Sequence, residues 1–260
     1  MVVDDKLISP IASQYLRLQM ARNVGPVCAR KLIDHFGDIE AIFNASIAAL
    51  EGVEGVGRQR AEGVVAAKDS DAADREIEAA EKRGLRIICW EDADYPKLLQ
   101  HITDPPLCLY VRGQLEPEDG VGVAIVGSRR CTRYGLEQAE RFGELLAGAG
   151  FTVVSGMARG ADAAGHRGAL RAGGRTVAVL GCGLGHLYPP EHADLADEIA
   201  ESGAVVSALP VDTAPDSANF PPRNRIVVGM SLGVLVIEAA KRSGALISAR
   251  LANEYNREVF

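Results

Sequence analysis

After residue 120, short apolar runs alternate with helical stretches, and this alternation constrains the fold of the 260-residue chain more than any other feature. The runs are continuous and rich in Val, Ile and Ala, which is typical of strands buried on both faces. Strands that alternate with helices predict a parallel sheet with right-handed crossovers. We therefore predict an α/β fold with a doubly wound, mostly parallel, Rossmann-like sheet. Strands are expected at 121–126, 151–154, 175–180, 204–207, 232–237 and 257–260, and helices at about 135–149, 160–172, 191–202, 223–231 and 243–255.

The first part of the chain follows a helical pattern instead. Apolar residues recur at helical spacing over residues 10–83. A weak repeat with an offset of 32 residues aligns Val24–Ala29 with Val56–Ala61, and each copy is a glycine turn that leads into a helix. This pattern is typical of a pair of helix-hairpin-helix units. Such turns either hold a DNA phosphate or only cap their helices; the acidic surroundings, with few cations beyond Arg58 and Arg60, favour the capping role.

A polar, turn-rich connector at residues 116–120 separates the two patterns, and a short strand-like segment at 85–90 precedes it. We predict an N-terminal all-helical domain, of the SAM or helix-hairpin-helix type, over residues 1–84. The sheet domain is predicted over 85–260, with its core starting at about residue 120.

Composition and charge exclude several classes of protein. No apolar run approaches the roughly 20 residues that a membrane-spanning helix needs, and the N-terminus lacks the pattern of a signal peptide, so we expect a cytoplasmic protein without a membrane partner. Five scattered cysteines without a C-x-x-C pair argue against disulfides and zinc.

The net charge of −7 arises before residue 120, where there are 21 acidic and 14 basic residues; from residue 120 onward there are 14 of each. The second part is thus neutral and free to present a basic face.

Ligands of doubly wound sheets bind at the carboxyl ends of the strands, so the loops there are the first place to look for a site. The loop after the first strand begins Gly127-Ser128-Arg129-Arg130. Its glycine, hydroxyl and arginines, followed by a helix N-terminus, predict binding of a phosphate group. The loop matches neither the G-x-G-x-x-G nor the G-x-x-x-x-G-K-[ST] pattern, so NAD, FAD and the usual ATPase site are unsupported and no cofactor is expected.

The loops after the next two strands are less specific. Ser155, Gly156 and Arg159 repeat the small-residue, glycine and arginine chemistry of the first loop. Asp162 and His166 lie one helical turn apart, and a structural hydrogen bond is the favoured use for them over catalysis. A metal site built from Cys182, His186 and His192 is not expected, because no carboxylate or second cysteine completes a ligand spacing.

The loop at 208–222 is long for an α/β connection and ends beside Phe220, Arg223, Asn224 and Arg225. An aromatic ring next to arginines and an amide suits single-stranded nucleic acid: the ring stacks on a base, and the cations bind phosphates. The alternative is that Phe220 fills the core and the arginines form ion pairs.

The last loop carries Glu238 and Ser243. Ser243 precedes a helix and is a candidate phosphate contact, whereas Glu238 has no partner acid and specifies no reaction. Taken together, the loops place a set of cations at one edge of the sheet. These are Arg129, Arg130, Arg133, Arg159, Arg223, Arg225, Lys241 and Arg242.

The ordered set of motifs resembles the DprA/Smf family of DNA-processing proteins over nearly the whole chain. The motifs are Tyr95-Pro96, Asp104-Pro105-Pro106, Gly127-Ser128-Arg129, Val154–Asp162, Ala178–Gly181, Tyr188-Pro189, Asn219–Arg225, Glu238-Ala239 and Ser243-Gly244, after the helix-hairpin-helix-like part.

The resemblance implies an extended Rossmann-like fold that binds single-stranded DNA without hydrolysing it. It also implies a homodimer, formed through the Rossmann part, that protects incoming DNA during natural transformation and loads the RecA recombinase onto it; no enzyme activity is expected. The DNA contacts that it implies are Arg129, Phe220, Arg223, Asn224 and Arg225. Gly127, Ser128, Ser155, Gly156 and Ser243 would add backbone or hydroxyl contacts, and Arg130 and Arg159 complete the predicted DNA-binding set.

Two departures from the family pattern are visible. The family usually has Ser-Glu before the long loop, where this chain has Ser207-Ala208. The sequence ends at Phe260, where the family usually continues through a strand and often into a winged-helix module, so we expect the sequence to be truncated there.

The competing hypothesis is an enzyme acting on a nucleoside monophosphate, similar to the lysine-decarboxylase-like phosphoribohydrolases. Those enzymes carry a Pro-Gly-Gly-x-Gly-Thr-x-x-Glu run. The corresponding stretch here starts at Glu238 and reads Glu-Ala-Ala-Lys-Arg-Ser-Gly-Ala, without the paired glycines and the spaced acid.

Overall fold

The computed structural model describes residues 8–9, 11–240 and 243–260 of the chain. The chain forms two compact units. The first comprises Met1–Ala93 and Thr103–Leu109, and the second comprises Asp94–Ile102 and Tyr110–Phe260. The predicted domain boundary after residue 84 stays a prediction. Within the described residues, every helix is too short or too polar to cross a membrane.

The first unit is mainly helical, with the short strand β1 (Arg86–Cys89). Gly25 and Gly57 precede helices α2 and α5 with nearly the same extended backbone, φ −90° and −81°, so the predicted repeat forms two equivalent turns. Large apolar side chains such as Tyr15, Leu32 and Ile42 are fully buried and form its core. The helices are α1 (Ala12–Gln19), α2 (Pro26–Phe36), α3 (Ile39–Asn44), α4 (Ile47–Glu51), α5 (Arg58–Lys68) and α6 (Ala72–Glu81).

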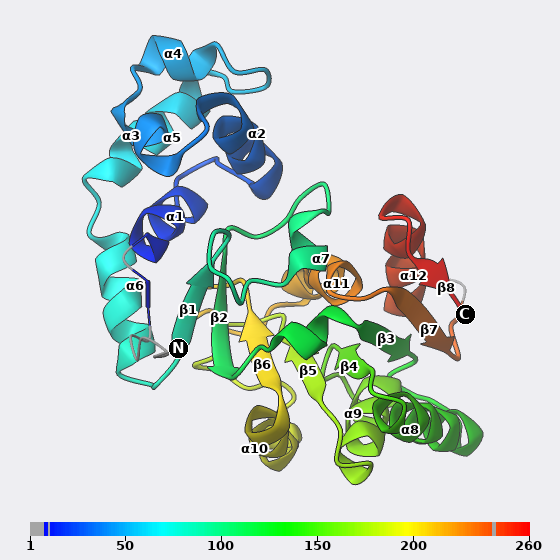
Figure 1. Ribbon diagram of the computed structural model, residues 1–260. Coiled ribbons are helices and arrows are strands. Elements are labelled where there is room, and N and C mark those ends of the chain that lie inside the picture. The colour runs from blue at the N-terminus through cyan, green and yellow to red at the C-terminus, as the bar shows by residue number, and fades with distance from the viewer. Residues whose placement is uncertain (1–7, 10, 241–242) are drawn as a thin grey trace. The chain divides into compact units, whose positions relative to one another are not determined.

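The second unit is built around a twisted sheet with the strand order β2-β6-β5-β4-β3-β7-β8 (Figure 1). β2 is antiparallel to β6, and the remaining neighbours are parallel. The predicted doubly wound, mostly parallel sheet is therefore confirmed, and each predicted strand lies within one residue of its expected ends. The strands are β2 (Cys108–Gly113), β3 (Gly122–Gly127), β4 (Thr152–Ser155), β5 (Thr176–Val179), β6 (Ala204–Ser207), β7 (Gly233–Ile237) and β8 (Glu258–Val259).

Helices cover both faces of this sheet, as Figure 1 shows: α8, α9 and α10 lie on one face, and α11 and α12 on the other. α8 and α9 pack closely because glycines face each other, and a Cβ on Gly143 would lie 2.2 Å from the carbonyl oxygen of Gly165. The helices of this unit are α7 (Lys97–Gln100), α8 (Arg133–Gly148), α9 (Ala161–Arg171), α10 (Ala193–Ser202), α11 (Phe220–Gly229) and α12 (Gly244–Glu254), with short 3-10 turns η1 (Pro117–Gly120), η2 (Pro190–His192) and η3 (Ser217–Asn219).

One helix starts earlier than expected. α11 begins at Phe220, three residues before the predicted start, with Pro221 in its first turn. Proline is favoured at the start of a helix because the first N–H groups have no partner within the helix. Phe220 is therefore fixed to a helix end and is not carried by a loose loop.

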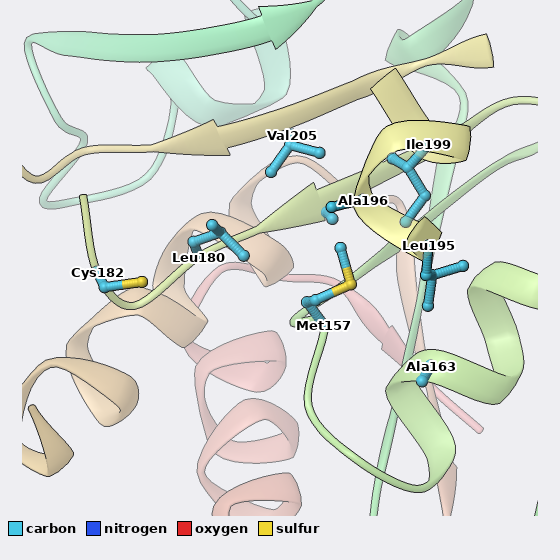
Figure 2. Close-up of a cluster of buried hydrophobic side chains, with 9 residues drawn as sticks. Met157, Ala163, Leu180, Cys182, Leu195, Ala196, Ile199 and Val205 are labelled. Atoms are coloured by element: carbon cyan, nitrogen blue, oxygen red, sulfur yellow. The ribbon is translucent and has the colours of Figure 1, made fainter. Parts of the chain in front are cut away.

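A buried apolar cluster fills the space between β5, β6, α9 and α10 (Figure 2). Met157, Leu180 and Leu195 are its larger members, and Tyr188 packs against it from the edge. This cluster anchors the loops that follow β4 and β5, which lead to the site described next.

Candidate functional site

A cleft of about 260 Å³ opens at the carboxyl ends of the parallel strands. This is the position expected for a ligand site in a doubly wound sheet, because the chain leaves neighbouring strands in opposite directions there. Polar and apolar groups both line it, from the loops after β3, β4 and β7 and from helices α9, α11 and α12. The lining residues are Val126, Gly127, Ser128, Arg129, Gly156, Ala158, Asp162, Phe220, Pro221, Arg223, Asn224, Val227, Ser243, Gly244, Ala245, Ile247 and Ser248.

The loop after β3 is held rigidly at one wall of the cleft. The backbone N–H of Ser128 donates to the carbonyl of Ile237 at 3.2 Å, and the Ser128 carbonyl accepts from the N–H of Ala161 at 3.3 Å. A Cβ on Gly127 would lie 2.1 Å from the Ile237 carbonyl oxygen, so only glycine fits between the strands here. The Ser128 hydroxyl accepts from the N–H of Arg130 at 3.1 Å. These contacts direct the exposed Arg129 side chain toward the mouth of the cleft.

Four side chains form a row at this mouth, which we call the ring–arginine row: Arg129, Phe220, Tyr188 and Arg159. The guanidinium carbon of Arg129 lies 5.2 Å from the centroid of the Phe220 ring, within the range of a cation–π contact. The rings of Phe220 and Tyr188 have centroids 5.6 Å apart and are tilted by 41°. The guanidinium carbon of Arg159 lies 5.9 Å from the Tyr188 centroid. Two adjacent rings are thus flanked by one guanidinium on each side.

Arg223 and Asp162 form a buried pair of opposite charge at the base of the cleft. Arg223 is 7% exposed, and its Nη1 donates to the carbonyl of Val179. Burial lowers the pKa of Arg223, an effect that the nearby Asp162 opposes. Burial raises the pKa of Asp162, while Arg223 and the N–H of Ala158, which donates to it at 3.2 Å, act in the opposite direction. Arg223 therefore lines the site from below and is less available than Arg129.

The N-terminus of α12 forms the opposite wall. Ser243 is the N-cap residue, yet its side chain makes no capping hydrogen bond. The Ser243 and Ser248 hydroxyls and the Nε of Arg223 are buried and without a hydrogen-bond partner. Asn224 Nδ2 donates to the Gly244 carbonyl at 3.3 Å. Unpartnered donors beside a helix N-terminus favour an anionic ligand with several oxygen atoms.

Other predicted residues are not among those that line the cleft. Ser155 is fully buried, and its hydroxyl donates to the Ile125 carbonyl at 2.5 Å, inside the sheet. Arg130 and Arg225 are not among the lining residues. Contacts of these three with DNA stay predictions. Arg133 is paired with Glu137 at 2.9 Å along α8, and Lys241 and Arg242 lie outside the described residues.

Glu238 serves as a cap for helix α8. Its carboxylate accepts from the backbone N–H of Thr132 at 2.8 Å and from the Thr132 hydroxyl. These hydrogen bonds lower the pKa of Glu238 and keep it ionised at the positive end of the helix dipole. The Glu238 carboxylate therefore has a structural role: it holds Thr132, the N-cap residue of α8.

The histidines and cysteines considered for a metal site have other contacts. The Cys182 thiol donates to the His186 carbonyl at 3.1 Å, and His192 Nδ1 lies 2.9 Å from the Met157 carbonyl. Among the described residues, no group of three or more His, Cys, Asp or Glu side chains is placed to hold a metal ion. His166 lies 2.6 Å from the Thr176 hydroxyl, a hydrogen bond within the fold.

Sequence reasoning left out three residues that shape this region. Tyr188 belongs to the Tyr188-Pro189 motif but is not among the predicted site residues, and the sequence does not predict that Ser248 and Asp162 line the cleft. Tyr188 follows the predicted strand at 175–180, so its position in a loop at the same sheet edge is the signal that could have identified it as a site residue. The spacing of Ser243 and Ser248 along one helix gave no comparable signal, because only the packing of α12 decides which of its faces lines the cleft.

Comparison with known proteins agrees with this architecture. The sequence model of the family described as DNA recombination-mediator protein A matches residues 86–260, and a helix-hairpin-helix motif matches residues 20–74. Protein Smf of Synechocystis sp. is 40% identical over 250 residues, covering 95% of this chain and 63% of that protein.

Two solved structures are also similar. That of DNA processing protein A from Streptococcus pneumoniae has a TM-score of 0.78 and 30% identity, covering 95% of this chain and 83% of that one. A structure of DNA processing protein A from Helicobacter pylori, described by its single-stranded DNA binding mode, has a TM-score of 0.61 and 33% identity, covering 67% of this chain and 79% of that one.

The chain spans about half to two thirds of the length of the curated relatives that it matches. The family match itself extends over more than half of the chain and includes every strand from β2 to β8 and the whole cleft. This protein belongs to the DprA/Smf family, the DNA recombination-mediator protein A family.

Proposed function

We propose that this chain binds single-stranded DNA in the cleft and along its mouth. The observation that carries the proposal is the placement of the Arg129 guanidinium beside the Phe220 ring, where the strands of the sheet end. A guanidinium binds the phosphate of a nucleotide, and an adjacent ring contacts its base, whichever base that is. Binding of this kind has little base preference and weakens as salt concentration rises.

The rest of the cleft supports the same ligand. Buried, unpartnered donors of Ser243, Ser248 and Arg223 line the cleft together with the N-terminus of α12, which favours an anion such as a phosphate. The Helicobacter pylori relative is described as binding single-stranded DNA, which supports the same class of ligand here.

The wider role that we propose is that of a non-enzymatic recombination mediator in the cytoplasm. In this role the protein is a homodimer that protects incoming single strands during natural transformation and loads RecA onto them. Membership of the recombination-mediator family supports this part of the proposal. Formation of RecA filaments on strands already coated with a single-strand-binding protein is the direct measurement, and it should become faster when this protein is added.

A gel-shift comparison of single- and double-stranded DNA of equal length tests the binding function. The single strand should bind more tightly, because stacking on Phe220 needs an unpaired base. Raising the salt from about 50 to about 200 mM should weaken binding strongly, since each phosphate contact releases condensed counterions. Equal affinity for the two forms would contradict the proposal.

Release of adenine from AMP would instead support the phosphoribohydrolase-like alternative. No contact of the described residues favours that alternative, and the acid nearest to its motif, Glu238, is engaged with Thr132.

A further inference from the structure

The ring–arginine row contains the same pair of groups twice. Arg129 lies over the Phe220 ring, and Arg159 lies over the Tyr188 ring, with guanidinium-to-centroid distances of 5.2 and 5.9 Å. The two rings are neighbours, 5.6 Å apart. Each pair offers one aromatic face and one cation, which is what a single nucleotide of a single strand uses.

The surface that joins the two pairs is continuous. A second, small hollow is lined by Arg159, Tyr188 and Pro189 together with residues that also line the main cleft. Its volume of about 20 Å³ is room for about one water molecule, so it cannot enclose a base. A base at this position therefore lies against the exposed part of a ring. The shared residues are Arg129, Gly156, Ala158, Phe220 and Arg223.

We propose that Tyr188 and Arg159 form a second nucleotide-binding unit beside Phe220, and that Glu191 occupies the phosphate position of that unit when no strand is bound. This inference rests on the proposed binding of single-stranded DNA and extends it. In this arrangement the single-stranded DNA runs from the N-terminus of α12, past Phe220, to Tyr188. The arrangement also makes Glu191 an internal competitor of the DNA backbone.

The ion pair between Arg159 and Glu191 has the properties of a replaceable contact. Arg159 Nε is paired with Glu191 Oε1, and the two side chains are 52% and 49% exposed. Exposed pairs of this kind contribute little to stability, so exchanging the carboxylate for a phosphate costs little. The Glu191 carboxylate in turn repels the phosphates of a DNA strand that approaches Arg159.

Tyr188 also has a structural contact, because its ring packs at the edge of the apolar cluster around Met157 and Leu180. A purely structural role predicts that Tyr188 variants change stability and leave DNA affinity unchanged. A binding role predicts that affinity depends on the presence of an aromatic ring. The variants Tyr188→Leu and Tyr188→Phe separate the two roles, since both fill the volume and only the second keeps a ring.

The first measurement is the affinity of the full chain for oligo-dT by fluorescence anisotropy. Tyr188→Leu should weaken binding at least about fivefold, from the loss of one stacked base. Tyr188→Phe should keep most of the wild-type affinity for oligo-dT. Thermal unfolding of both variants shows whether the fold is kept; if Tyr188→Leu does not fold, the next two variants, at exposed side chains, decide.

The second measurement is the salt dependence of binding. Glu191→Gln should bind oligo-dT more tightly than wild type at low salt, by about threefold, because Arg159 no longer has a carboxylate partner. Arg159→Gln should weaken binding and reduce the slope of log affinity against log salt by about 0.7, the value for one phosphate on a single strand. Glu140→Gln is the matched control: it removes the same charge from an exposed pair, Arg171–Glu140, between α8 and α9, away from the cleft.

Tighter binding by Glu191→Gln but not by Glu140→Gln, with weaker binding by Tyr188→Leu, supports the second unit. Wild-type affinity in Tyr188→Leu or Arg159→Gln, while Arg129→Ala and Phe220→Ala lose binding, would overturn it and leave the proposed function standing. Weaker binding by Glu191→Gln would overturn the role of Glu191. If wild type does not bind oligo-dT, the proposed function itself fails.

Discussion

Arg129 and Phe220 lie side by side, with 5.2 Å between the guanidinium carbon and the ring centroid, although they follow different strands of the sheet. Arg129 lies two residues after the end of β3, and Phe220 is the first residue of helix α11, which follows β6. The parallel arrangement of the strands brings both to one edge. The Phe220 ring packs closely on Gly181, where a Cβ would lie 2.6 Å from Cδ1 of the ring, and Phe220 is half-buried.

Replacing either member of this pair should weaken DNA binding. We expect Phe220→Ala to cost about 1–3 kcal/mol of binding free energy, through loss of a stacking surface. Arg129→Ala should weaken binding and lower its salt dependence, because a phosphate contact is lost. Titration of labelled oligo-dT followed by fluorescence anisotropy measures both effects.

Matched controls come from helices away from the cleft. Phe142→Ala removes a partly exposed ring from α8, and Arg171→Ala removes an exposed arginine from the end of α9. Both should bind oligo-dT like wild type. If the controls lose as much affinity as the site variants, the assignment of the site is wrong.

Two of the hydroxyls predicted to contact DNA, those of Ser243 and Ser155, should behave differently. Ser243→Ala removes an unpartnered hydroxyl that lines the cleft and should weaken binding of oligo-dT severalfold. Ser155→Ala breaks the hydrogen bond to the Ile125 carbonyl and should cost about 1 kcal/mol of unfolding free energy with wild-type affinity. Urea unfolding measures the stability of both variants, and fluorescence anisotropy measures their affinity for oligo-dT. Loss of affinity in Ser155→Ala at unchanged stability would instead support the sequence-based role of Ser155.

Gly127→Ala should disrupt the loop after β3. The added Cβ would meet the Ile237 carbonyl oxygen at 2.1 Å and the Ala161 Cβ at 2.6 Å, and neither neighbour is the end of a flexible side chain. We expect a loss of about 3 kcal/mol or more of unfolding free energy, measured by urea denaturation. Gly148→Ala, at the end of α8 with open space around it, is the control and should be stabilising by about 0.5–1 kcal/mol. Similar stability of the two variants would contradict this account of the loop.

His166 should make stability depend on pH. The Thr176 hydroxyl donates to the Val153 carbonyl, so it accepts from His166 Nδ1 and leaves Nε2 buried without a partner. Burial, aided by the nearby His192 and Arg223, lowers the pKa of His166 to about 3. The unfolded chain takes up this proton near pH 6.5 and the folded protein does not, so stability is full above about pH 6.5 and falls as the pH drops toward 3.

Urea unfolding of wild type and His166→Gln at about pH 6.5 and 5 measures this contribution. Wild type should lose about 2 kcal/mol more than the variant between these values, because each pH unit in this range is worth about 1.4 kcal/mol per proton. The exposed His186 supplies the control, and His186→Gln should follow wild type. Parallel pH profiles for wild type and His166→Gln would refute the assignment.

Much of the second unit could be predicted from the sequence because its signals are local. Short runs of small and apolar residues such as 204–207 favour strands that are buried on both faces, and the structure has β6 at those residues. The helix–strand order then restricted the connections to parallel crossovers, which fixed the edge at which Arg129 and Phe220 emerge. The start of α11 was predicted three residues late, because the Pro221-Pro222 pair resembles a loop in sequence and also suits the first turn of a helix.

The sequence by itself determined the sheet, the family motifs and the group of loops that meet at one edge, because periodicity and turn residues act over a few positions. Only the tertiary structure decided which side chains in those loops reach the cleft. It buried Ser155 and Arg223, kept Arg129 exposed, and brought Tyr188 next to Phe220. Exposure and ring contacts depend on how whole strands and helices pack against one another, and residue types at a given spacing do not encode that packing.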